Sequence, residues 1–341
     1  MSNLDERIIE AFKQGRVKGL VEPGVKPECL MTGISHIFLF PKTVYKLYRK
    51  DNDSFNKNSL DLSDDDIRQH FYENDFSFNN YFSKEIYNAL LSIYVNGEHV
   101  ELKPKDEPGY DLVIQMSRVD EKKNLTHLLR QKALNEDELR SIGYKMTKLV
   151  AEYPQKPKTS KNYYEVLASF IDGVRHFGSM AAPLISLDDS EKVCPALSDY
   201  RETIKGKLTK ITEKDFIFTI DNHSDKAFYI NKELLFIYVY LPKIEWGIVE
   251  PSYVITRLYT DTLVFAGEKY SEALLQGYKD YYGIIDVDRE LLEFYLIFNA
   301  FLRAGYIFTS YRDSGLLEKK EEAEAHWELL RRKIPNLSII K

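Results

Sequence analysis

The sequence predicts an α+β protein of two lobes, a small β-rich lobe followed by a larger helical one. The chain of 341 residues exceeds the length of one average domain. Short β-rich runs dominate its first part, whereas helical periodicity dominates the rest and is interrupted by one hairpin pattern at 216–241. We therefore expect an N-terminal lobe over residues 1–115 and a C-terminal lobe over residues 116–341.

The N-terminal lobe is predicted to hold a leading helix, an antiparallel sheet and one crossing helix. A helix is expected over residues 4–20, and the stretch SHIFLFPKTVYKLYRK at 35–50 predicts two strands around a tight PKT turn. The polar stretch at 51–66 predicts a loop, in which Ser63 caps the helix expected over 67–82. A second hairpin turns at the NGE of 96–98, and residues 110–119 supply a third strand.

The C-terminal lobe is predicted to be mostly helical. Asn135, with Glu138 three residues later, predicts a capping box at the start of a helix. Further helices are expected over 163–177, 191–213 and most of 251–334. The last of these, at 318–333, has acids early and bases late, as the helix dipole favours, and Trp327, Leu330 and Ile334 are expected to dock it on the lobe.

Composition excludes several classes of function. The net charge of −6 leaves no general basic surface for nucleic acid. Only two cysteines occur, without a CxxC pair, which argues against a disulfide framework or a zinc ribbon and suits a reducing compartment. The N-terminus lacks the apolar core of a signal peptide. The apolar run at 234–241 is far shorter than the roughly 20 residues of a membrane span. We expect a cytoplasmic protein that binds neither nucleic acid nor membrane.

Lys46 is the first candidate functional residue. It lies in the β-rich run TVYKLY at 43–48, and the helix that follows carries Glu73 and Asp75. A strand lysine oriented by a helix carboxylate can hold the α- and β-phosphates of a nucleotide, because the lysine supplies the charge and the carboxylate fixes its direction. The alternative is a solvent-facing strand lysine beside an ordinary surface acid on the helix.

The pattern around Lys46 resembles the N-terminal lobe of aminoglycoside-phosphotransferase-like proteins. The stretch MTGISHIFLFPKTVYKLYRK and the stretch SLDLSDDDIRQHFYENDFSFNNYFSKEIYN carry the resemblance, which continues to about residue 155. It is strongest to the bacterial branch that is often fused to a P-loop ATPase domain. The residues that fall in matching order are Thr32, Ile34, Ser35, Val44, Tyr45, Lys46, Asp61, Ser63, Glu73, Asn79 and Tyr87.

The resemblance implies a protein-kinase-like fold of the aminoglycoside phosphotransferase and choline kinase type, with ATP as the nucleotide. Lys46 would then be the phosphate lysine, and either Glu73 or Asp75 would be its helix partner. Gln115 and Met116 would lie at the hinge and face the adenine. The lobes would meet near residues 113–120.

The catalytic loop departs from the family pattern. That pattern is His-Gly-Asp, a second His two residues after the Asp, and an Asn five residues after it. Aligned on the following strand, the catalytic Asp falls on Asp221 and the second His on His223, but the leading His-Gly becomes Thr219-Ile220 and the Asn becomes Lys226. Lysine has no lone pair for a metal while it is charged, so Lys226 cannot ligate Mg²⁺. His223 could also be a purely structural hydrogen-bonding residue.

The second magnesium ligand of the family is missing as well. It should be an Asp at the end of the next strand, yet no Asp occurs from Lys226 to Thr260. Asp225, with Glu245 or Glu250, could rebuild a metal site together with Asp221; the alternative is that Asp225 and Glu245 are surface charges. Mg²⁺ neutralises phosphate charge in this chemistry, so loss of its usual ligands would remove a main source of transition-state stabilisation.

Two functions remain open at this point. The first is a degenerate, pseudokinase-like protein that binds a nucleotide, and an unknown small molecule or protein, without efficient phosphoryl transfer. The second is an active ATP-dependent small-molecule phosphotransferase with a rearranged metal site, or a variant that transfers a nucleotide. We favour the first, because the lysine that would bind phosphate is retained and the metal ligands are not.

Overall fold

The computed structural model of the chain describes residues 3–58, 60–107, 109–180, 185–212, 215–241 and 247–334. It divides into two compact units, each described here by itself. Unit 1 comprises Met1–Lys123 and Leu235–Lys243, and unit 2 comprises Asn124–Leu234 and Ile244–Lys341. The boundary expected at residues 115 and 116 falls inside strand β6 (Asp111–Ser117).

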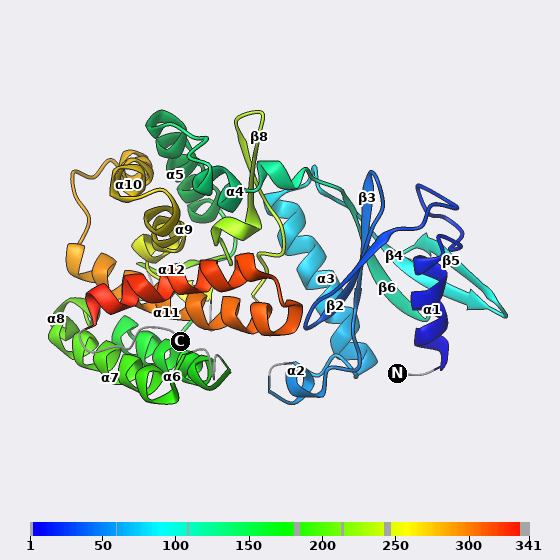
Figure 1. The fold of residues 1–341 in the computed structure, drawn as a ribbon, viewed down its shortest axis with the longest axis horizontal. Coiled ribbons are helices and arrows are strands. Elements are labelled where there is room, and N and C mark those ends of the chain that lie inside the picture. Colours follow the sequence, from blue (N-terminus) through cyan, green and yellow to red (C-terminus); the bar gives the residue numbers. More distant parts are fainter. Residues whose placement is uncertain are drawn as a thin grey trace. The chain divides into compact units, whose positions relative to one another are not determined.

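Unit 1 is built on a six-stranded antiparallel sheet in the order β1-β2-β3-β6-β4-β5. Helix α3 (Asp65–Phe82) lies along one face of this sheet and α1 (Asn3–Lys13) lies on the other (Figure 1). Both expected hairpins are confirmed. The remaining strands are β1 (Glu28–Met31), β2 (Ser35–Leu39), β3 (Thr43–Tyr48), β4 (Tyr87–Asn96) and β5 (His99–Pro104).

Three details of the N-terminal prediction are wrong. The first helix ends at Lys13 rather than near residue 20, because the chain turns at Gly15 in a left-handed conformation. The stretch expected to be a loop contains α2 (Asp53–Asn58), whose first turn is capped by the side chain of Asn52 accepting the N–H of Phe55. Asp64, not Ser63, caps α3 by accepting the N–H of Ile67.

Unit 2 is mostly helical, as expected. The capping box at Asn135 and Glu138 is confirmed, since each side chain accepts the other residue's backbone N–H. The helices are α4 (Leu125–Arg130), α5 (Glu136–Ala151), α6 (Tyr163–Met180), α7 (Leu187–Thr203), α8 (Lys205–Leu208), α9 (Pro251–Phe265), α10 (Glu268–Tyr282), α11 (Arg289–Ser314) and α12 (Leu317–Lys333).

Short strands in unit 2 frame the predicted catalytic loop. Strand β7 (Ile217–Phe218) pairs with β10 (Ile248–Val249), and β8 (Ala227–Ile230) forms a hairpin with β9 (Glu233–Phe236). The loop between β7 and β8 ends in a 3₁₀ turn, η3 (Ser224–Lys226). After β9 begins, the chain passes into unit 1 at Leu235.

The core of unit 2 gathers around α9, α11 and α12. Helices α11 and α12 pack side by side (Figure 1). Trp327 and Leu330 of α12, and Ile334 directly after it, are buried as expected. Helix α11 is long and apolar enough over the 24 residues Arg289–Arg312 to cross a membrane by those criteria alone. However, 83% of the most apolar 18-residue stretch of α11 is buried inside the protein, which is typical of a core helix.

Candidate functional site

Strand periodicity turns Lys46 toward α3. Alternate residues of a strand face opposite sides of the sheet, so Tyr45 and Lys46 face different helices. The Tyr45 ring lies 5.6 Å from that of Phe12 on α1. Lys46 Nζ forms an ion pair of 3.1 Å with Asp75 Oδ2 of α3, and both side chains are nearly inaccessible to solvent. The lysine is therefore held on the sheet face that α3 covers.

Asp75 is the carboxylate that orients Lys46. Its other oxygen, Oδ1, accepts the side-chain N–H of Asn79, one turn later in α3, at 2.9 Å. Glu73, the alternative partner, instead pairs with Lys105 at 2.9 Å and is partly exposed. Two residues along a helix correspond to a rotation of about 200°, so Glu73 and Asp75 project from nearly opposite sides of α3.

Two tyrosine rings complete the surroundings of the Lys46 ammonium. The ring centroids of Tyr48, on the same strand, and of Tyr238, in the segment after β9, lie 4.7 and 4.5 Å from Nζ. Both distances are within the range of a cation–π interaction. Burial, with the negative charge of Asp75 nearby, raises the pKa of the Tyr48 hydroxyl well above its ordinary value.

The two expected hinge residues face opposite sides of the sheet. Strand β6 pairs with β3, which sets Met116 opposite Val44 and Gln115 opposite Tyr45. Directly paired residues share a face, so Met116 is on the same face as Lys46 and Gln115 is on the face of α1. Met116 is buried and Gln115 is half-buried. Of the two, only the Met116 side chain therefore shares a surface with the predicted phosphate lysine.

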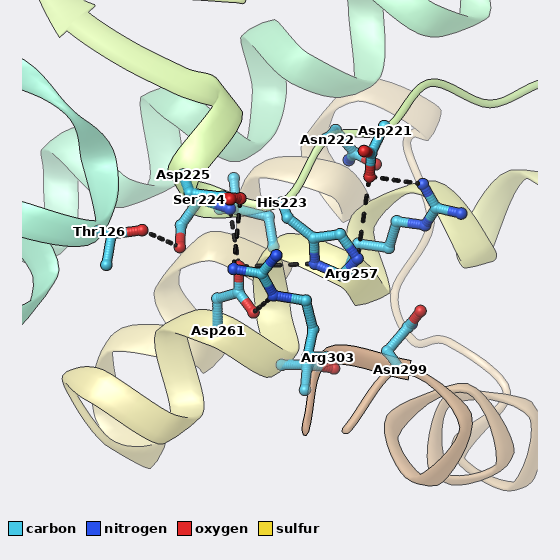
Figure 2. Close-up of polar contacts among 12 residues, drawn as sticks. Thr126, Asp221, Asn222, His223, Ser224, Asp225, Arg257, Asp261, Asn299 and Arg303 are labelled. Atoms are coloured by element: carbon cyan, nitrogen blue, oxygen red, sulfur yellow. Dashed lines mark hydrogen bonds and ion pairs between the residues drawn. The ribbon is translucent and has the colours of Figure 1, made fainter. Parts of the chain in front are cut away.

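The loop at 219–226 in unit 2 carries the predicted catalytic residues (Figure 2). Asp221 Oδ1 lies 3.3 Å from the Arg257 guanidinium, and the Asp221 side chain remains 32% exposed. Arg257 projects from α9 and also donates to the carbonyl oxygen of Ile220 at 2.9 Å. Asp221 thus keeps access to solvent while its charge is partly balanced by an arginine.

His223 is buried between two carboxylates. Its Nδ1 lies 3.6 Å from Asp261 and its Nε2 lies 4.0 Å from Asp221. Burial lowers the pKa of His223, and the nearby charge of Arg303 lowers it further. Asp261, on α9, also accepts the backbone N–H of Ser224 at 2.7 Å. This acid therefore holds the turn that follows the histidine.

Asp225 is paired with an arginine. Its Oδ1 lies 3.3 Å from Arg303, which projects from α11 and also pairs with Asp261 (Figure 2). Arg303 pairs with Glu322 of α12 as well. Burial works against the charge of Asp225, but Arg303 and Lys226 outweigh it and lower the pKa to about 2. The pKa of Arg303 is raised by its three acids in spite of burial.

The described residues do not form the magnesium site that the sequence resemblance implies. Glu250 caps α9, where its carboxylate accepts the N–H groups of Ser252 and Tyr253, and burial raises its pKa. Glu245 lies outside the residues that the structure describes. Within the described ranges, no three His, Cys, Asp or Glu side chains gather closely enough to hold a metal ion. Lys226 stands where the resemblance predicts a metal-binding Asn, and its pKa is raised by Tyr306 and Asp225 against the effect of burial.

Sequence reasoning missed the residues that organise this loop, namely Arg257, Asp261, Arg303 and Glu322. One signal could have found two of them. Asp261 and Arg303 are each the one charged residue in a helical stretch, TDTLVF and NAFLRAGYIF respectively. A charged residue on a buried helix face must be paired, because burying an isolated charge is costly. Each of these residues therefore predicts a partner of opposite charge, although not which one.

Asp225 is expected to make stability depend on pH. Its pKa is about 2 in the folded protein and about 3.9 in an unfolded chain. The stabilisation is therefore fully present above about pH 4 and is lost as the pH falls through 2. Wild type should exceed Asp225→Asn in free energy of unfolding by a constant margin above pH 4 that shrinks toward pH 2. Urea unfolding at stepped pH measures this margin. Asp188→Asn, at an exposed acid, is the control, and a margin that grows on acidification would contradict the pairing.

Comparison with known proteins shows the fold. No family model matches the sequence, and no curated protein sequence matches it. Among solved structures, choline kinase from Cryptosporidium parvum Iowa II is similar with a TM-score of 0.56 and 12% identity, over 96% of this chain and 95% of that one. A choline/ethanolamine kinase family protein from Mesorhizobium loti has a TM-score of 0.52 and 10% identity, over 96% of both chains.

A third structure extends the likeness to the aminoglycoside enzymes. The GDP complex of aminoglycoside 2'-phosphotransferase-IIIa has a TM-score of 0.50 and 13% identity, over 98% of this chain and 100% of that one. The chain therefore has the two-lobed protein-kinase-like fold of the choline kinase and aminoglycoside phosphotransferase type, and the expected fold class is confirmed.

Proposed function

We propose that this chain is a nucleotide-binding protein of the kinase-like phosphotransferase class whose capacity for Mg²⁺-dependent phosphoryl transfer is degenerate. The observation that carries the proposal is the buried pair of Lys46 and Asp75. Keeping a lysine and an aspartate out of water is costly unless both are well paired, and Asn79 further fixes the acid. A pair placed on this strand and this helix is the arrangement by which the fold holds nucleotide phosphates.

The likeness to nucleotide-bound structures supports the same class of ligand. The aminoglycoside 2'-phosphotransferase-IIIa structure is a GDP complex. We propose ATP for this chain, with Met116 as the hinge residue whose side chain lies on the Lys46 face. The bacterial branch that is fused to a P-loop ATPase domain remains part of the proposal, on the sequence resemblance alone.

The residues of the loop at 219–226 favour nucleotide binding without efficient phosphoryl transfer. The position of the metal-binding Asn is taken by Lys226, and Asp225 is neutralised by Arg303. A lysine at position 226 adds one positive charge to the loop, but a lysine does not polarise and clamp a transferring group as Mg²⁺ does. A bound nucleotide is therefore expected to be held without a requirement for metal.

One observation keeps the active phosphotransferase as a second candidate. Asp221 remains 32% exposed, and His223 Nε2 lies 4.0 Å from it. An accessible carboxylate in this loop could still accept or orient a proton of a substrate hydroxyl. Such an enzyme would need a cation beside the γ-phosphate, and residues other than the usual ligands of the family would have to hold that cation.

Calorimetric titration of ATP into wild type and Lys46→Ala tests the proposal. With EDTA present, wild type should bind and Lys46→Ala should lose about tenfold to hundredfold in affinity, the range for one hydrogen bond to a charged group. Lys103→Ala removes a partly exposed strand lysine of the same sheet and is the matched control, with no expected change. Binding that requires Mg²⁺ would favour the active phosphotransferase, and binding that is equal in Lys46→Ala would overturn the proposed site.

A further inference from the structure

An aromatic ring from a distant part of the chain, that of Tyr238, lies against the Lys46 ammonium. Lys46 is 5% exposed, and the Tyr238 ring centroid is 4.5 Å from its ammonium. A phosphate oxygen must approach an ammonium nitrogen to roughly 2.8 Å to form a charge-assisted hydrogen bond. With Asp75 and two rings around Nζ, the enclosed lysine leaves little room for such an approach.

The ring is placed by a short segment that binds α3 and its C-terminal end. In this segment, residues 235–241, three backbone N–H groups donate to side chains of unit 1. Phe236 donates to Ser83 Oγ at 2.6 Å, Tyr238 to the Tyr87 hydroxyl at 2.9 Å, and Val239 to Asn79 Oδ1 at 2.9 Å. Hydrogen bonds to individual side chains hold Tyr238, rather than a continuous β-ladder at that residue.

Asn79 connects the segment to the lysine. Its side-chain oxygen, Oδ1, accepts the backbone N–H of Val239. Its side-chain nitrogen, Nδ2, donates to the carboxylate of Asp75, the partner of Lys46. Movement of the segment would therefore release one side of Asn79, which fixes the Asp75 carboxylate. The position of the ring and the orientation of the ion pair are linked through this one amide.

Tyr238 itself has an unusual backbone. Its φ of 56° is in the left-handed region, which a residue with a Cβ rarely adopts without support from its surroundings. Its ring is half-buried, whereas its neighbours Phe236 and Val239 are fully buried and anchor the segment. A displaced Tyr238 can relax to an ordinary backbone conformation.

We propose that Tyr238 controls access to Lys46, so that its ring must leave the ammonium before the phosphates of a nucleotide can bind there. The identity of the ligand as a nucleotide rests on the proposed function. The contact between the Tyr238 ring and Lys46 is independent of that function. The Tyr238 ring therefore lowers the affinity for a nucleotide, because the ring and a phosphate compete for contact with the Lys46 ammonium.

Chemical labelling of Lys46 tests the cover without any nucleotide. Reductive methylation with formaldehyde and cyanoborohydride, read by mass spectrometry, should modify Lys46 about tenfold faster in Tyr238→Gly than in wild type. Glycine removes the ring and suits the positive φ, so this variant is expected to fold. Tyr238→Asn, which also tolerates that conformation, is the second variant. Tyr240→Ala is the matched control in the same segment, because that ring packs on Phe71 and Phe78.

ATP titration of the same variants tests the competition. Tyr238→Gly should bind ATP about fivefold to tenfold more tightly than wild type, the size of one cation–π contact, and Tyr238→Phe should match wild type. Equal labelling rates in wild type and both ring-free variants would overturn the inference, whether or not ATP binds. Faster labelling with no ATP binding by any variant would support the cover over Lys46 and overturn the proposed function instead.

Discussion

Replacing Arg303 with methionine is expected to lower the free energy of unfolding by about 3–5 kcal/mol, the cost of leaving buried charges unpaired. Arg303 is 2% exposed and faces Asp225, Asp261 and Glu322. Asp261 and Glu322 are at most 1% exposed, so water cannot replace the missing guanidinium. Methionine keeps a long apolar stem of similar reach, which limits the contribution of a cavity to the loss.

Urea unfolding followed by far-UV circular dichroism measures this loss. Arg289→Met is the matched control, because Arg289 starts the same helix and pairs with Glu272 at 3.0 Å but is 51% exposed. Exposed pairs contribute about 0–1 kcal/mol, so the control should remain close to wild type. Arg303→Met combined with Asp261→Asn should recover part of the loss, since one of the unpaired acids is gone. A loss below about 1 kcal/mol in Arg303→Met would contradict the buried charge cluster.

Gly143→Ala is expected to cost about 2–3 kcal/mol, although alanine is the better helix former. Gly143 of α5 lies against the backbone of α10, where an added Cβ would overlap the carbonyl oxygen of Leu274. Gly277 of α10 meets α5 in the same way, at the carbonyl of Arg140. The two helices therefore touch backbone to backbone, and a methyl group would have to push them apart.

The control for Gly143→Ala is a glycine-to-alanine change that is expected to raise the free energy of unfolding instead of lowering it. Gly173 lies within α6, and an added Cβ there would meet no atom within 4 Å. Gly173→Ala should therefore raise the free energy of unfolding by about 0.5–1 kcal/mol through helix propensity and the loss of unfolded-state freedom. Urea unfolding of both variants decides the point. Two changes of the same sign would contradict the close contact of α5 and α10.

Local patterns were sufficient for most of the elements. Both hairpins, the helical character of unit 2 and the capping box at Asn135 follow from residues within a few positions of one another, so the sequence predicts them directly. The short helix α2 was missed because a single apolar residue, Phe55, among its six residues gives no apolar periodicity. Ser63 and Asp64 are both good caps, and only the observed start of α3 distinguishes them.

The candidate site was predicted in part. Lys46 could be identified because the strand around it and the resemblance are both local in sequence. The choice between Glu73 and Asp75 could not be made, because it depends on the rotation of α3 about its axis relative to the sheet. The hinge residues illustrate the same limit. Which of Gln115 and Met116 faces the Lys46 side is decided by strand register, and a register shift of one residue reverses it.

Residue order alone was enough to predict the fold class, which the comparison with solved structures confirms. A phosphate-binding role for Lys46 and the loss of the magnesium ligands that the resemblance implies stay predictions, and both rest on residue identity at short spacing. Only the tertiary structure revealed that Arg303 joins acids from the loop at 219–226, from α9 and from α12. It alone places Tyr238 over Lys46, 192 residues away along the chain. Such contacts depend on how helices rotate and pack against one another, and long-range packing leaves no periodic pattern in the sequence.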